Sequence, residues 1–136
     1  EESYRLLIDE LPSPVRSQGR TVNLLVRYSI PVFFGPPQAA RPSIAWSAAV
    51  QGHRLILTAR NDGERRLRIA SLQVRDSKGA VVSFGNGLVG YVLGRSSMTW
   101  TAPNSARGLD NAGTISIAAQ SDLGPIHATA PVIIRR

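Results

Sequence analysis

The sequence lacks cysteine altogether, and its 136 residues include one methionine and no run of 18 apolar residues. Without cysteine the chain cannot form disulfides or thiolate metal sites, and without a long apolar run it offers no transmembrane helix. A chain of this length buries roughly two thirds of its unfolded surface, so a core can form without covalent cross-links. We therefore expect a protein held together by its core and not inserted into a membrane.

Residues suited to enzyme chemistry are scarce as well. The two histidines, His53 and His127, have no partner at the spacing of metal ligands, and the nine acidic residues are dispersed along the chain. No Gly-x-Ser-x-Gly nucleophile motif occurs. We interpret both histidines as surface or edge imidazoles, and we expect no enzymatic activity, no metal and no cofactor.

One motif of enzymes does occur as a string of letters. Residues 85–90 read Gly-Asn-Gly-Leu-Val-Gly, which matches Gly-x-Gly-x-x-Gly and follows an apolar stretch at 81–84. A dinucleotide site requires a helix after this string, but residues 91–94 are β-prone and contain glycine. We interpret the string as a loop between strands. The alternative, a dinucleotide-binding enzyme, predicts cofactor binding in a thermal-shift assay.

Positive charge is abundant, because 15 arginines and one lysine face nine acidic residues and give a net charge of +7. Residues 1–36 are neutral, so the excess lies entirely in residues 37–136, with 12 basic and five acidic residues. The charges are spread through turns and strands without the clustered aromatics of a single-strand binder. We interpret them as a solvated surface and do not expect nucleic-acid binding.

Apolar and polar residues alternate with a period of two, which predicts strands. The first strand covers Tyr4–Asp9 and ends before Pro12, and a longer one covers Thr21–Phe34. The longer strand places Asn23, Leu25, Arg27 and Ser29 on one face, and Val22, Leu24, Val26, Tyr28 and Ile30 on the other.

Gly35-Pro36-Pro37 interrupts this pattern and predicts a stiff corner between residues 1–36 and residues 37–136. After the corner, turn signals separate short strands, which is typical of an antiparallel immunoglobulin-like β-sandwich without its cysteine pair. The predicted fold is thus all-β. The strands are expected at residues 44–50, 55–60, 67–75, 80–84, 91–93, 97–101, 114–120 and 126–132.

Residues 2–12, a polar loop with Gly19, and residues 22–36 together resemble the end of the first domain of the periplasmic pilus-assembly chaperones, the PapD-like family. In that family two immunoglobulin-like domains meet at a short corner after a Phe-x-x-Pro ending. The resemblance implies that residues 1–36 are the last two strands of an incomplete first immunoglobulin-like domain. It also implies a periplasmic protein whose signal peptide and further strands precede Glu1 in a longer precursor.

The resemblance implies a function as well. Such chaperones lend a strand to pilus subunits that lack their last one, until an outer-membrane usher exchanges it for the next subunit; donor-strand complementation is a form of β-augmentation. Val22, Leu24 and Val26 match the family's donor residues, with Tyr28 as a fourth. Two alternatives stay open: these side chains are the inward face of an ordinary strand, or the chain is a structural or adhesive surface module.

Pro31 departs from the family, which has a basic residue there that anchors the carboxylate of the subunit. The form Ile30-Pro31-Val32-Phe33 resembles divergent chaperones that serve spore-coat-U-like pilins. Arg27 is the candidate replacement cation. Because two strands alone are marginal in water, we expect residues 4–34 to pair between molecules, as a strand-swapped homo-oligomer, or to dock on the second domain.

Overall fold

The computed structural model describes residues 1–12, 24–102 and 113–135. These residues form strands and no helix, which confirms the predicted all-β class. Consequently none of the described segments is a helix long and apolar enough to cross a membrane. The chain divides into two compact units, unit 1 at Glu1–Pro36 and unit 2 at Pro37–Arg136, which are described in turn.

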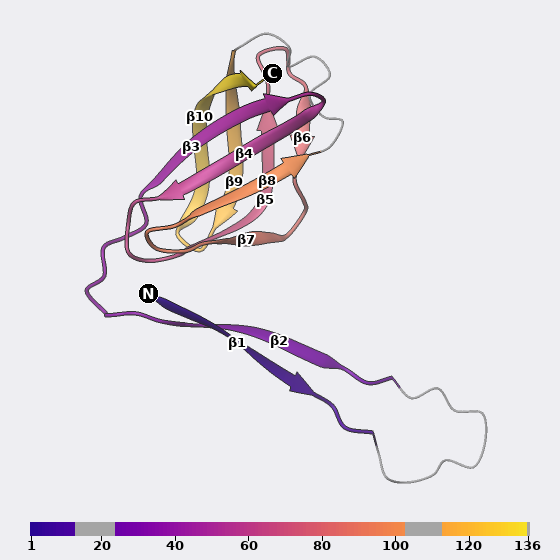
Figure 1. Ribbon diagram of the computed structural model, residues 1–136, viewed down its shortest axis with the longest axis vertical. Helices are drawn as coiled ribbons and strands as arrows, with labels where there is room; N and C mark the ends of the chain where they lie inside the picture. The colour runs from indigo at the N-terminus through magenta and orange to yellow at the C-terminus, as the bar shows by residue number, and fades with distance from the viewer. Residues whose placement is uncertain (13–23, 103–112, 136) are drawn as a thin grey trace, which may run out of the picture. The chain divides into compact units, whose positions relative to one another are not determined.

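Unit 1 is an antiparallel hairpin of β1 (Glu2–Asp9) and β2 (Arg27–Phe34) (Figure 1). The pairing runs from Glu2 opposite Phe34 to Asp9 opposite Arg27 without a bulge. The predicted first strand agrees with β1 to within two residues at its start. The predicted start of the second strand at Thr21 is wrong for the described residues 24–26, which lie outside any strand.

Pro12 limits how far the pairing of β1 and β2 can continue. Beyond the last pair, Asp9 opposite Arg27, the Glu10 amide still donates a hydrogen bond of 3.0 Å to the Val26 carbonyl, but the Val26 amide donates to Oε2 of Glu10 at 3.2 Å instead of to its carbonyl. Because hydrogen-bonded pairs recur at every second position, continuing the register would place Pro12 and Leu24 at the next one. Proline has no N–H to donate there, so the ladder cannot resume beyond Glu10 and Val26.

Unit 2 is a two-layered β-sandwich (Figure 1). Strands close in sequence are divided between the layers in the immunoglobulin-like manner. One layer contains β3 (Ile44–Gln51), β4 (Arg54–Asn61) and β8 (Ser97–Ala102), and the other contains β5 (Leu67–Arg75), β6 (Val81–Ser83), β9 (Thr114–Ser121) and β10 (Gly124–Arg135), with β7 (Leu88–Val92) paired to β5.

The last strand joins the two layers. β10 pairs with β9 in antiparallel fashion up to Pro131, and from Val132 to Arg135 it pairs with β3 in parallel. The two layers thereby form one curled, mixed sheet. The other pairings described in unit 2 are antiparallel, so the predicted sandwich differs in this one respect.

The core lies between the layers, where the inward positions of the alternating strands meet. Trp100 stacks on Trp46 with ring centroids 6.0 Å apart, and its indole Nε1 donates to the Val89 carbonyl at 3.0 Å. The largest fully buried apolar side chains come from both layers: Leu55, Leu57, Ile69, Leu72, Val74, Val92, Ile115 and Ile117.

The glycine string at residues 85–90 is only partly the loop that the sequence predicts. Its last three residues belong to β7, which begins at Leu88. Gly90 has a φ of 153°, a conformation that other residues rarely adopt, and a Cβ atom there would also displace the end of the Met98 side chain on β8, whose Cε would lie 2.2 Å away. No helix follows the string, so the geometry of a dinucleotide-binding turn is absent from this segment.

Candidate functional site

The hairpin of unit 1 has one apolar face that unit 1 leaves uncovered. Opposed residues of an antiparallel pair lie on the same face, and Leu6 opposite Ile30 is one such pair. The side chains remain largely accessible, with 50% of Leu6 and 57% of Tyr28 exposed. We call this surface the apolar face; it consists of Tyr4, Leu6, Ile8, Tyr28, Ile30, Val32 and Phe34.

The sequence prediction covered only half of this surface. It places Tyr28 and Ile30 on one face of the second strand but includes no residue of β1. Tyr4, Leu6 and Ile8 occur at every second position, and this alternation is a signal that could have found them. The rings of Tyr4 and Phe34 meet edge to face, with centroids 5.9 Å apart, at the end of the hairpin where Glu2 lies opposite Phe34.

Two of the predicted donor residues lie just before β2. Leu24 is 83% exposed and Val26 is 39% exposed, and Val26 is held to Glu10 through hydrogen bonds at both its carbonyl and its amide. Tyr28 lies within β2 on the apolar face. Val22 lies outside the described residues.

The opposite face of the hairpin is largely polar. The Arg27 guanidinium donates to both carboxylate oxygens of Asp9, through Nε and, at 3.1 Å, through Nη2. This hydrogen bonding raises the pKa of Arg27 above its ordinary value. Arg5 donates to the Ser29 hydroxyl at 2.8 Å. Arg27, the candidate anchor for a carboxylate, thus already has a carboxylate partner, and a second one must share the guanidinium or displace Asp9.

The outer edge of β2 is a second feature of the hairpin. Because the Val26 carbonyl accepts the Glu10 amide and so points toward the partner strand, alternation directs the backbone groups of Tyr28 and Ile30 toward β1 and those of Arg27 and Ser29 outward. Pro31 is the next outward position and has no N–H. An incoming strand can therefore form an uninterrupted ladder only along the part of this edge that precedes Pro31.

Unit 2 shows no arrangement of metal-binding residues in the described part of the chain, where no three His, Cys, Asp or Glu side chains cluster. Both histidines are exposed, His53 beside the β3–β4 turn and His127 on β10, in agreement with their interpretation as surface imidazoles.

The sequence matches no protein-family model and no curated protein. Among solved structures, the chain is similar to a modular endo-β-1,4-mannanase from Cellulomonas fimi, with a TM-score of 0.39 and 17% identity over 70% of this chain and 19% of that one. It is also similar to an engineered protein, with a TM-score of 0.38 and 17% identity over 71% of this chain and 20% of that one. The chain thus spans about a fifth of the length of each.

Proposed function

We propose that this chain belongs to a periplasmic chaperone of pilus subunits, which it stabilises by donor-strand complementation through residues 21–30 before delivery to an outer-membrane usher. The observation that supports this function best is the combination of an exposed apolar face with an open strand edge on one hairpin. A lent strand needs both, because backbone hydrogen bonds hold it and alternate side chains fill pockets in the client.

The apolar side chains supply the affinity in this proposal. Leu24, Val26 and Tyr28 alternate along the chain and present exposed apolar surface. Moving a large apolar side chain from water into a groove contributes about 1.5–3 kcal/mol before ordering costs. Burial of these three side chains in the groove of a client is therefore the main source of affinity in this proposal.

The backbone sets the extent of the lent strand. Arg27 and Ser29 offer outward amide and carbonyl groups, and the missing N–H of Pro31 ends the continuous ladder after Ile30. Leu24 and Leu25 lie outside the strands of the hairpin, so they can pair with a client without first breaking strand pairs. This limit agrees with a donor segment that ends at Ile30.

The decisive experiment replaces Leu24 by arginine in the full-length protein and measures co-purification with the pilus subunits encoded beside it. We expect Leu24→Arg to abolish capture, because a guanidinium cannot enter an apolar pocket without a partner. Leu25→Arg is the matched control: Leu25 is exposed, adjacent in sequence and of opposite parity, so this variant should still capture subunits.

Equal capture by the Leu24 variant and the wild type would overturn the donor assignment. Equal loss in both variants would show that added charge alone disrupts binding, which also contradicts the pocket model. If the wild type captures no subunit, the proposed chaperone function is wrong, and a structural or adhesive module becomes the better account of the sandwich.

A further inference from the structure

Unit 2 carries a hollow of about 440 Å³ that is rich in arginine. Three segments distant in sequence form it: the stretch before β3, the loop between β4 and β5, and the turn between β9 and β10. All three lie at the end of the sandwich where β4 ends and β5 begins (Figure 1). We call it the basic hollow; it is lined by Arg41, Pro42, Arg65, Arg66, Asp122 and Leu123.

The basic hollow has an excess of positive charge. Three guanidinium groups face one carboxylate, which leaves a net charge of +2 in the lining. The Asp122 carboxylate also accepts a hydrogen bond of 3.2 Å from the Arg68 amide. Within the described residues, the side chains of Arg41 and Arg65 form no ion pair, whereas Arg60 and Arg95 pair with neighbouring acids at 3.1 and 3.5 Å.

Backbone hydrogen bonds fix the segments that carry two of these arginines. The Ala40 carbonyl accepts the amides of both Glu64 and Arg65 at 3.1 Å, and the Ala40 amide donates to Oε2 of Glu64 at 2.9 Å. Gly63 lies against the backbone of Arg41, since a Cβ atom at Gly63 would come within 2.1 Å of the Arg41 carbonyl oxygen. The stretch before β3 is therefore packed directly on the β4–β5 loop.

Asn61 connects the same segments from within. Its side chain is buried, with a relative exposure of 1% for the residue. Oδ1 accepts the amides of Ser43 at 3.1 Å and Gly63 at 2.9 Å, and Nδ2 donates to the carbonyls of Arg65 at 2.7 Å and Val92 at 3.3 Å. A buried residue with four hydrogen bonds thus positions the backbone on both sides of the basic hollow.

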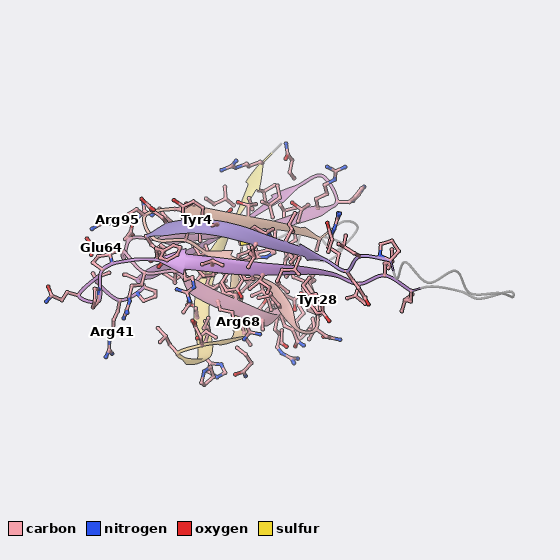
Figure 2. All side chains as sticks on the ribbon, turned by 90° about the horizontal axis from the view of Figure 1, so that it is seen from below. Tyr4, Tyr28, Arg41, Glu64, Arg68 and Arg95 are labelled. Atoms are coloured by element: carbon pink, nitrogen blue, oxygen red, sulfur yellow. The ribbon has the colours of Figure 1, made fainter. Side chains whose placement is uncertain are left out.

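We infer that the basic hollow binds a phosphate monoester group through Arg41, Arg65 and Arg66. A guanidinium presents paired N–H donors in a rigid fork that matches the oxygens of phosphate. A phosphate monoester carries about −1.5 to −2 charges at neutral pH, which balances the net charge of the lining better than one carboxylate does. In Figure 2, Arg41 and Glu64 lie on the same side of the view. The Glu64 carboxylate accepts a hydrogen bond from the Ala40 amide and so holds the segment that carries Arg41.

The held backbone favours binding. An arginine on a fixed segment loses less freedom on binding than one on a loose loop, so a preorganised cluster binds an anion more tightly than scattered surface arginines do. Nothing in this inference depends on donor-strand complementation, because each residue that it uses belongs to unit 2. Its failure and the failure of the proposed chaperone function are therefore independent.

The test measures binding of inorganic phosphate to the whole chain by isothermal titration calorimetry at constant ionic strength. A second arm measures co-sedimentation with vesicles that contain phosphatidic acid in phosphatidylcholine, against pure phosphatidylcholine vesicles, because a lipid headgroup is another source of the same group. The double variant Arg41→Gln/Arg65→Gln should lose affinity by about tenfold or more in whichever arm shows binding.

Arg54→Gln is the matched control, because it removes the same charge at the opposite end of β4. It should change affinity by less than about twofold, as expected for a remote exposed charge. Saturable binding in either arm that the double variant loses and the control keeps supports the inference and identifies the source of the phosphate. Binding in neither arm, or equal losses in both variants, would overturn it. Thermal unfolding of each variant checks that the fold is retained.

Discussion

Asn61 is the only buried polar residue in the described part of the chain. Its side chain forms hydrogen bonds to the backbone of the β4–β5 loop and of the segments beside it. Asn61→Ala leaves two amides and two carbonyls without their partner. We expect the free energy of unfolding to fall by about 2–4 kcal/mol, since each unsatisfied buried group costs about 1–3 kcal/mol and entering water recovers part of it. Urea denaturation measures the change.

Gln120→Ala is the control for this prediction, because Gln120 is exposed on β9. Its effect should stay within about 0.5 kcal/mol. A loss for the Asn61 variant no greater than that of the control would mean that water fully replaces the amide, and that Asn61 does not hold the loop.

Glu64 gives the chain an acid-sensitive contact. The hydrogen bond from the Ala40 amide, and next to it the one from Arg95, lower the pKa of the Glu64 carboxyl below its ordinary value. A carboxyl whose pKa is lower in the folded than in the unfolded state stabilises the fold above its unfolded pKa. That contribution disappears as the pH falls through the folded pKa.

Glu64→Gln should therefore be less stable than the wild type near neutral pH, and the difference should vanish in acid. Chemical denaturation of both proteins from about pH 7 to about pH 3 measures this, because the range spans the titration of carboxyl groups. A difference that persists unchanged at the acidic end would mean that the charge of Glu64 does not contribute.

Asn61 shows where sequence reasoning stops at the residue scale. The sequence Asn61-Asp62-Gly63 is typical of a turn, and the chain does turn after β4, but the same pattern also suits an exposed asparagine. The burial of Asn61 depends on the backbone of Ser43 and Val92, which are distant in sequence. Turn propensity carries no information about such partners.

At the scale of elements, Pro12 controls how far β1 and β2 pair. Pro12→Ala restores an N–H at the position that faces Leu24 in the continued register. We expect the hairpin to lengthen by one hydrogen-bonded pair. Hydrogen-exchange NMR should show protection of the new amide at residue 12, together with a cross-strand contact to Leu24.

Leu11→Ala is the matched control for that change. Leu11 occupies the intervening position, where amides point away from the partner strand, so the amide of residue 11 should gain no protection in this variant, which keeps Pro12. If Pro12→Ala gains none either, a cause other than the missing N–H ends the ladder.

Period-two alternation predicts the existence of strands far better than their partners. β5 has the predicted bounds Leu67–Arg75, because alternation and flanking turn residues both mark it. The parallel pairing of β10 with β3 leaves no trace in either strand's own pattern. For the candidate site, alternation predicts which side chains of β2 share the exposed face. It does not predict how far β2 can pair with β1, because that limit depends on Pro12, which lies on the other side of the hairpin.

At the scale of the whole molecule, the two units differ in how they bury apolar residues. Unit 2 encloses a core between two layers, whereas every residue of β1 in unit 1 is exposed. Two strands without a covered face are marginally stable in water. An exposed apolar sheet face with open edges is also a template for association with another chain.

We therefore expect the purified chain to self-associate through unit 1, because the apolar face of a second copy can cover the same face of the first. Two copies related by a two-fold axis would each use this face, which is the arrangement of closed dimers. Sedimentation velocity over a range of concentrations should show a dimer for the wild type and a monomer for Leu6→Lys, which places a charge in the centre of the apolar face.

Leu7→Lys adds the same charge to the opposite face and should leave the dimer intact. A wild type that stays monomeric at every concentration contradicts the prediction, and dimers in both variants would place the interface elsewhere than on the apolar face.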